Sequence, residues 1–344
     1  MRATVLTDAA LTKHAGRFVW LSIDTEDAKN AAFLDRYPWE AVPTFEVIDA
    51  KADRVAYSWI GAVDAAELAR RFDEAERAFR GTDAAAGASA ASPDAAVLAL
   101  SLAGKNEECA RRALLLLPEL PRAVVKANVA STGLDCALSA EEGAPWRAAA
   151  VATLEAAVRE TLDDQGLLDD DRSGLYSALV DARTRQKDET GAKATALGWL
   201  DWLDAQARSA PSVEARAALD GYRVSAALSA GTPERVVAVI RRSERELPND
   251  YNPPARLALV LREMGRYDEA LAASDRALAK VYGPRKLTLL DARATIFEKK
   301  GDPARAKATL EQAIAYASTL PKSQRPKGLI ARIEKRLGQV APAD

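Results

Sequence analysis

The sequence contains few of the residues from which catalytic and metal sites are most often built. Among its 344 residues are two cysteines, Cys109 and Cys136, and one histidine, His14. A structural zinc site takes several Cys and His ligands, and these residues are too far apart in sequence to suggest one. A His-based catalytic triad would depend on His14 alone, and we expect that side chain to face solvent from an N-terminal helical stretch. These shortages predict a protein that is not an enzyme and that holds no metal or cofactor.

Charge and hydropathy argue against two further classes of protein. The formal net charge is −2, whereas a general nucleic-acid binder carries a basic excess that neutralises phosphates. No apolar run approaches the ~20 residues that span a bilayer. The first residues, Met-Arg-Ala-Thr-Val-Leu-Thr-Asp, lack the apolar core of a signal peptide. We therefore expect a soluble, cytoplasmic protein that binds neither nucleic acid nor a membrane.

What the sequence does contain is a repeat. Gly231, Gly265 and Gly301 follow one another at intervals of 34 and 36 residues, and each ends one predicted helix and precedes another. Glycine suits the left-handed conformation that ends many helices. Thr232 and Asp302 stand where the next helix would take its N-cap. A constant period of this length predicts a stack of helix–turn–helix units.

The side chains around these turns predict how the helices pack. In one unit an apolar face meets a row of small residues: Leu257, Leu261 and Met264 against Ala270, Ser274 and Ala277. Such rows let two helices approach closely. This sequence pattern, with Gly265, Tyr267 and Ala270, resembles the tetratricopeptide repeat (TPR) family over residues 251–318, and more loosely over 217–250. The resemblance implies an α-solenoid whose concave face binds a protein or peptide.

The N-terminal residues have a different pattern. Short β-rich runs alternate with helical patterns: strands at 18–24, 44–48 and 56–59, and helices at 26–36 and 64–80. With Val42-Pro43-Thr44-Phe45 before the second strand, this order resembles the C-terminal two-thirds of a thioredoxin domain, over residues 1–80. In that family the proline of such a segment is cis and faces the active-site disulfide, so the resemblance assigns that place to Pro43.

The thioredoxin family carries its chemistry in a Cys-x-x-Cys pair, which the sequence does not contain. We therefore expect a truncated, redox-inactive thioredoxin-like segment fused to TPR repeats, an arrangement of bacterial thioredoxin/TPR-type proteins. The alternative is a thiol-disulfide oxidoreductase whose Cys-x-x-Cys lies upstream of an incorrectly assigned start at Met1. In that case the sequence would not predict the cellular compartment either, because a signal peptide could lie upstream as well.

The predicted fold is mainly α, a TPR-like α-solenoid with a small, incomplete α/β domain. Its parts are the thioredoxin-like segment 1–81, a flexible linker 82–92, irregular repeats 93–216, regular repeats 217–320, and a capping helix with tail 321–344. We expect Cys109 to be a buried structural thiol and Cys136 to lie in a helix. The sequence does not decide whether the two form a disulfide with each other. Trp199 and Trp202 are expected to anchor packing between repeats.

One acidic segment invites a calcium interpretation. Asp169-Asp-Asp171-Arg-Ser173-Gly174 resembles the start of an EF-hand loop, but Val180 stands where a bidentate glutamate is required. We expect instead a charged loop that caps a helix from Gly174 onward.

The predicted function is a non-catalytic scaffold that binds a protein or peptide on the concave face. Chaperone-tail binders of the TPR family use a Lys and Asn carboxylate clamp, and its positions here hold other residues: Gly221, Ser225, Ala255, Leu259, Asp291 and Thr295. We therefore expect no carboxylate-clamp partner. The candidate binding residues form a mixed-charge set with a neighbouring basic loop: Asn252, Arg262, Asp291, Glu298 and Lys299, with Arg285 and Lys286. For each of them a solvated helix face or loop is the alternative.

Overall fold

The computed structural model describes residues 5–6, 8–39, 42–60, 63, 65–80, 93–120, 123–164 and 166–339. The fold is mainly α-helical and of the TPR solenoid type, with a small two-stranded sheet. The chain divides into two compact units: residues 1–20 with 39–201, and residues 21–38 with 202–344. The predicted linker 82–92 lies outside the described residues. Among the described helices, none is long and apolar enough to cross a membrane.

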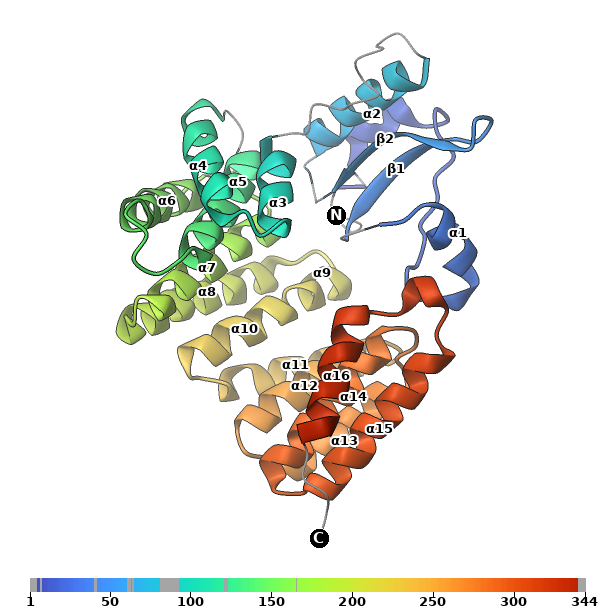
Figure 1. The fold of residues 1–344 in the computed structure, drawn as a ribbon, viewed down its shortest axis with the longest axis vertical. Coiled ribbons are helices and arrows are strands. Elements are labelled where there is room, and N and C mark those ends of the chain that lie inside the picture. The colour runs from blue at the N-terminus through green and yellow to red at the C-terminus, as the bar shows by residue number, and fades with distance from the viewer. Residues whose placement is uncertain are drawn as a thin grey trace. The chain divides into compact units, whose positions relative to one another are not determined.

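The first unit begins with a small α/β part (Figure 1). Its elements are η1 (Ala9–His14), β1 (Thr44–Asp49), β2 (Arg54–Ile60) and α2 (Ala65–Arg80). The strands β1 and β2 pair antiparallel, and Phe45 and Trp59, which face each other across the pair, stack with ring centroids 4.6 Å apart. Trp59 packs with Leu68 and Phe72 of α2 to form the core of this part. The strands predicted at 44–48 and 56–59 and the helix at 64–80 are confirmed, and the Val42–Pro43 peptide bond is cis.

The strand predicted at 18–24 is wrong, because this segment pairs with no neighbouring strand in the described part of the chain. Its aromatic side chains pack on α2 instead. The rings of Phe18 and Trp20 lie 5.5 and 5.1 Å from that of Phe72. Val19, between them, is 90% exposed. A β-rich composition becomes a strand only where a backbone partner completes the ladder.

His14 is buried, and the prediction that it faces solvent is wrong. Its ring lies edge-on to Phe72 with centroids 5.3 Å apart, and its Nδ1 is 2.9 Å from a nitrogen of Arg17. Burial lowers the pKa of His14, because the charged imidazolium loses its hydration. The residue is a core side chain of the α/β part.

The rest of the first unit is helical. Its elements are α3 (Pro93–Leu102), α4 (Asn106–Leu116), η3 (Leu117–Glu119), α5 (Ala123–Ser139), α6 (Arg147–Leu162), α7 (Asp169–Arg185) and most of α8 (Glu189–Ser209). Their core is continuous from Val97 to Ala182. Trp199 is buried, stacks on Tyr176 and donates to Ser173, which confirms its predicted packing role.

Two predictions for this region are corrected. The acidic run at Asp169 is not a loop but the first turn of α7, where carboxylates favour the positive end of the helix dipole. The sulfur of Cys109 is not a free thiol, because it is joined to Cys136 in a disulfide whose Cα atoms are 6.1 Å apart. The repeat places both cysteines on the inner faces of α4 and α5, where the two helices pack against each other.

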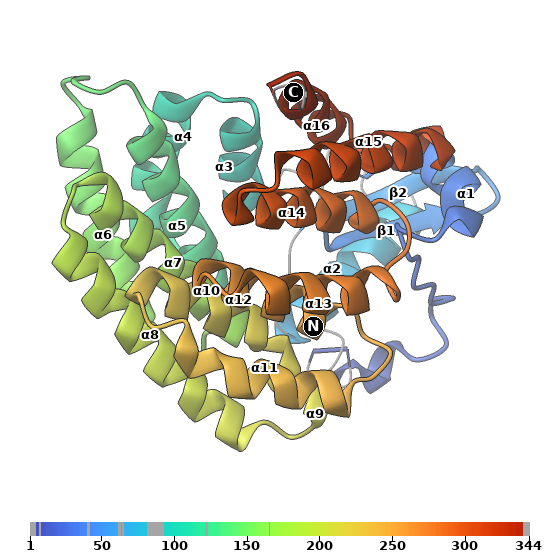
Figure 2. The ribbon, with the colours of Figure 1, turned by 90° about the horizontal axis from the view of Figure 1, so that it is seen from below.

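The second unit contains the regular repeats. Its elements are η2 (Ala28–Asn30), α1 (Ala31–Arg36), the end of α8, α9 (Val213–Ala218), α10 (Asp220–Ala230), α11 (Glu234–Glu246), α12 (Asn252–Glu263), α13 (Tyr267–Leu278), α14 (Arg285–Lys300), α15 (Pro303–Thr319), η4 (Lys322–Gln324) and α16 (Lys327–Gln339). Antiparallel helices α12 and α13, and then α14 and α15, form successive pairs (Figure 2). The helix predicted at 26–36 begins at Ala28, and its buried residue is Leu34.

The repeat turns are as predicted at the glycines. Gly231, Gly265 and Gly301 all have positive φ, between 73 and 82°. Asp302 caps α15 by accepting a hydrogen bond from the backbone N–H of Arg305. The N-cap predicted at Thr232 is wrong, because α11 begins one residue later, after Pro233. The small residues Ala270, Ser274 and Ala277 are all buried between helices, as their spacing predicted.

Candidate peptide-binding surface

The predicted candidates at the C-terminal ends of α12 and α14 form one ion-paired cluster. Glu263 accepts from Arg262 and from Lys299, at 2.7 and 2.8 Å, so that the Lys299 pair joins α12 to α14. The two cations lower the pKa of Glu263 against the opposing effect of its partial burial, which is the largest single influence on it. Glu263 and Lys299 are exposed and Arg262 is partly exposed. We call Arg262, Glu263 and Lys299 the charged cluster.

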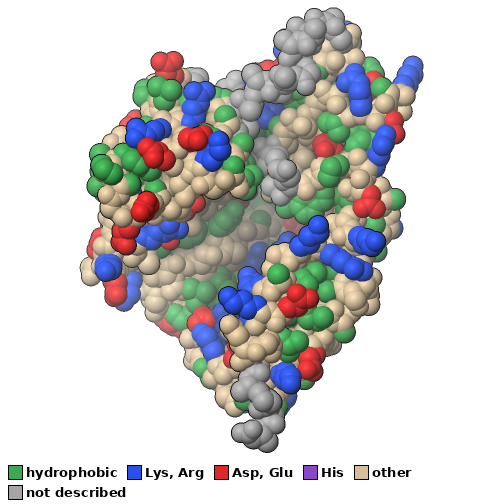
Figure 3. Space-filling view, viewed as in Figure 1, with side chains coloured by type: hydrophobic (Ala, Val, Ile, Leu, Met, Phe, Trp, Pro, Cys, Tyr) green, Lys and Arg blue, Asp and Glu red, His purple; other side chains and the backbone are tan. Residues whose placement is uncertain are grey.

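Asp291 is not open to a ligand, and this prediction is corrected, whereas Glu298 is ion-paired but exposed. Helix α16 packs against α14 and α15 (Figures 1 and 2). Asp291 is 7% exposed and is bound by Arg332 and Arg336, and Glu298 accepts from Arg336. An amphipathic cap that buries its apolar side, as α16 does at Ile333, also brings its arginines onto these carboxylates. Side chains of both signs are interspersed over the face of α14 to α16 (Figure 3).

Asn252 has a local structural role. Its backbone and side-chain N–H groups both donate to Asp250, at 2.8 Å, at the start of α12. Two prolines follow it within the first turn, where their missing N–H groups cost nothing. Asn252 therefore helps begin α12 and is not brought together with the charged cluster.

The predicted basic loop between α13 and α14 is occupied by an acidic segment of the same chain. Tyr282 donates to Asp24 at 2.5 Å, and Arg285 donates to Glu26 at 3.1 Å. Lys286 does not join them, because its ammonium lies over the ring of Tyr316, 5.1 Å from the centroid. Sequence reasoning identified the loop through its charge and its place between repeats. It did not identify what the loop binds.

Gln324 completes the contact and was missed by sequence reasoning. It is buried in η4, and its amide Nε2 donates to two backbone carbonyls, those of Thr25 and Asp27, both at 3.0 Å. A side chain that satisfies two carbonyls of an irregular segment holds the backbone itself. The signal in the sequence was the short acidic run from Asp24 to Asp27, in which Asp27 pairs locally with Lys29 while Asp24 and Glu26 meet distant partners.

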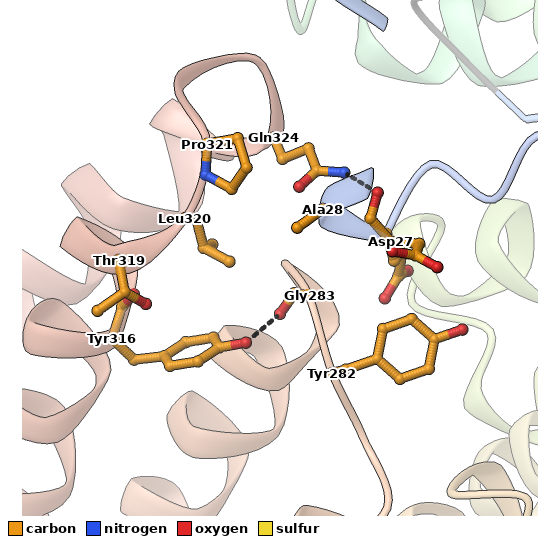
Figure 4. Close-up of a pocket in the computed structure, with 10 residues that line it drawn as sticks. Asp27, Ala28, Tyr282, Gly283, Tyr316, Thr319, Leu320, Pro321 and Gln324 are labelled. Atoms are coloured by element: carbon orange, nitrogen blue, oxygen red, sulfur yellow. Dashed lines mark hydrogen bonds between the residues drawn. The ribbon is translucent and has the colours of Figure 1, made fainter. Parts of the chain in front are cut away.

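A hollow of about 460 Å³ remains beneath this segment. Figure 4 shows that Ala28 and Leu320 point into it from opposite sides, and that Tyr316 closes its far end. The hydroxyl of Tyr316 donates to the backbone carbonyl of Gly283 at 3.3 Å, which ties α15 to the loop.

Gly283 allows the loop and the segment to approach. Its φ is +60°, and a Cβ built on it would lie 2.2 Å from the backbone oxygen of Glu26. We expect Gly283→Ala to weaken the contact by about 1 kcal/mol, because the loop must move away or adopt a strained conformation. Amide hydrogen exchange in residues 21–38 should then be about fivefold faster. Gly328→Ala, on α16 where a Cβ meets nothing within 4 Å, is the matched control; equal exchange in both variants would contradict this role of Gly283.

Paired helices, glycine turns and buried rows of small residues define an α-solenoid of the tetratricopeptide type. In agreement, residues 251–318 match the tetratricopeptide repeat family. Two similar solved structures are YrrB, described as a TPR protein with an unusual peptide-binding site, and BtubC (BKLC) from P. vanneervenii. YrrB is 15% identical with a TM-score of 0.31, over 62% of this chain and 92% of its own. BtubC is 14% identical with a TM-score of 0.40, over 72% and 95%. A search of curated proteins found no match.

Proposed function

We propose that this protein is a non-catalytic interaction scaffold, which binds a protein or peptide partner on the first helices of its repeats, α10, α12 and α14. The observation that carries the proposal is the regular stack of helix pairs over residues 251–318, matched by the TPR family. Stacked pairs align their first helices along one surface, on which an extended peptide or a partner helix finds room. The charged cluster lies on two of these helices and supplies groups of both signs.

The N-terminal segment is proposed to contribute packing or partner contact rather than thiol chemistry. In support, Cys109 and Cys136 are joined to each other and are almost fully buried. Neither sulfur is therefore a thiolate, which is the nucleophile of thiol exchange. The thioredoxin-like interpretation of residues 1–81 stays a prediction, as does a cytoplasmic location. It gains support from the order of α1, β1, β2 and α2, which follows the predicted helix, two strands and closing helix.

A charge-reversal experiment tests the proposed surface. A partner is first identified by cross-linking in the protein's own source, and its dissociation constant is then measured with purified components. We expect Arg262→Glu with Lys299→Glu to weaken binding about tenfold or more, because both new carboxylates would stand beside Glu263. The thermal melt should change little, since exposed ion pairs contribute at most about 1 kcal/mol.

The matched control reverses two charges on second helices, Arg245→Glu on α11 with Lys307→Glu on α15. It changes the net charge by the same amount and leaves α10, α12 and α14 untouched. Equal loss of affinity in both double variants would mean that net charge, and not the charged cluster, governs binding. Unchanged affinity in both would remove this surface as the site.

A further inference from the structure

Residues 24–28 form a turn that leads into η2, and both their side chains and their backbone carbonyls are bound by residues distant in sequence. Two acidic side chains at alternate positions, Asp24 and Glu26, meet Tyr282 and Arg285, while Gln324 binds the backbone carbonyls between and after them. The partners come from the α13–α14 loop and η4, more than 250 residues away in sequence.

The segment is held mainly by polar contacts. Every residue from 21 to 38 is described, and among their side chains only Leu34 is buried, at 6% exposed. The Arg285–Glu26 pair is half-exposed on the arginine side, and such pairs contribute about 1 kcal/mol or less. The hydrogen bond that Tyr282 donates to Asp24 raises the pKa of Tyr282 to about 12, which keeps the phenol a donor throughout the physiological range. Little apolar area opposes displacement of residues 24–28.

The hollow beneath Ala28 indicates what would bind there better. Ala28 points into a space of about 460 Å³ but fills little of it, facing Leu320 and the ring of Tyr316. A longer apolar side chain at this position would bury itself against both groups. Each additional buried methylene contributes about 0.8 kcal/mol. The site is therefore more complementary to a peptide with a bulky apolar residue two places after its second acidic residue than to the chain's own segment, in which Ala28 follows Glu26 at that distance.

We propose that the α13–α14 loop, Tyr316, Leu320 and Gln324 form a binding site for acidic peptide segments of the pattern Asp-x-Glu-x-Φ, where Φ is a large aliphatic residue. The chain's own residues 24–28, with Ala28 at the Φ position, occupy this site in the absence of the partner. Arg285 begins α14 and Lys299 stands near its other end, so this site is distinct from the charged cluster. Either proposal therefore stands or fails without the other.

The test uses the full chain and two fluorescein-labelled peptides. One peptide has the sequence of residues 21–30, and the other carries the Ala28→Leu change. In the variant Asp24→Asn with Glu26→Gln, which vacates the site, we expect the unchanged peptide to bind about tenfold more tightly than to the wild-type chain. The Ala28→Leu peptide should bind about tenfold more tightly still. Fluorescence anisotropy measures both.

Two controls define the site. Arg285→Glu or Gln324→Ala, each added to the vacated variant, should abolish binding of either peptide, whereas Arg262→Glu with Lys299→Glu should leave it unchanged. A peptide of the same composition in scrambled order should not bind. Equal binding by the scrambled peptide, or binding that survives Arg285→Glu, would overturn the proposal.

A second measurement covers the case in which the vacated variant fails to fold. Excess Ala28→Leu peptide added to the wild-type chain should displace the resident segment and speed amide hydrogen exchange in residues 24–28 about tenfold. Exchange that does not change at saturating peptide, or the absence of any binding to the wild-type chain at millimolar peptide, would contradict an exchangeable site. Neither outcome bears on the charged cluster.

Discussion

Replacement of Arg223 with methionine should lower the free energy of unfolding of the second unit by about 3 to 5 kcal/mol. Arg223 is buried in α10 and binds Asp204 at 2.5 Å and Asp220 at 3.4 Å. Asp220 is fully buried and also accepts from the hydroxyl of Ser243 at 2.6 Å. Without the guanidinium, the carboxylate of Asp220 would keep its burial and lose the cation that is hydrogen-bonded to it, so that of the two cations that lower its pKa only Arg256 would remain. Urea unfolding followed by circular dichroism measures the loss.

The pH dependence of this variant identifies the cause. Burial raises the pKa of Asp220, while Ser243 and Arg223 oppose that rise. Removal of Arg223 should raise the pKa further, so that the folded state takes up a proton at a pH where the unfolded chain remains ionised. Stability of the variant should therefore recover as the pH falls from 7 toward 5, and be lost again as it rises through the folded-state pKa.

The double variant Asp220→Asn with Arg223→Met provides the control. It removes the charge that Arg223 neutralises, and it should regain most of the stability at pH 7 with little dependence on pH. If the single variant were as stable as the wild type, or if its deficit did not narrow on acidification, the uncompensated carboxylate would not be the cause.

Loss of the Cys109–Cys136 disulfide should lower the stability of the first unit by about 3 to 4 kcal/mol. The bond joins α4 to α5 across a sequence separation of 27 residues, and it restricts the unfolded chain by closing a loop of that length. Calorimetry of the variant Cys109→Ala with Cys136→Ala measures the effect on this unit. The neighbours of the disulfide in the α4–α5 core include small side chains such as Ala110 and Ala113. The cavities that the two alanine substitutions leave are therefore small.

Reduction separates loop closure from packing in this second prediction. The wild-type chain with a phosphine reductant should lose about the same free energy as the alanine variant, and the reductant should not affect the variant at all. A wild-type melt that is unchanged by full reduction, with thiol content confirmed by mass spectrometry, would contradict a stabilising role. Such bonds are rare in reducing compartments.

The regular repeats could be predicted because the information there is local. The period of the glycines, their left-handed conformations and the small residues of α13 all follow from helix geometry within a few tens of residues. Helix and strand positions in the α/β part were predicted for the same reason. Phe18 to Asp24 was mistaken for a strand because a strand depends on a partner elsewhere in the chain, and composition does not reveal that partner.

The binding surface was predicted only in part, because its contacts are not local. The charge and position of Arg285 were visible in the sequence, but its partner Glu26 is 259 residues away. Asp291 was predicted to be available to a partner for the same reason, since the arginines that bind it lie on α16. Gln324 looks like any polar residue of a loop until the backbone carbonyls of Thr25 and Asp27 are placed beside it. Contacts between residues so far apart in sequence can be identified only once the fold is known.

The discontinuity of the second unit has a consequence for biosynthesis. Thr25 leaves the ribosome 299 residues before Gln324, which binds its backbone carbonyl. At about 5 to 20 residues per second, the interval is on the order of 15 to 60 seconds. Throughout that time the acidic segment is without its final binding site, while the intervening helices can already fold. The second unit is therefore completed only after Gln324 has been made, by a segment synthesised long before it.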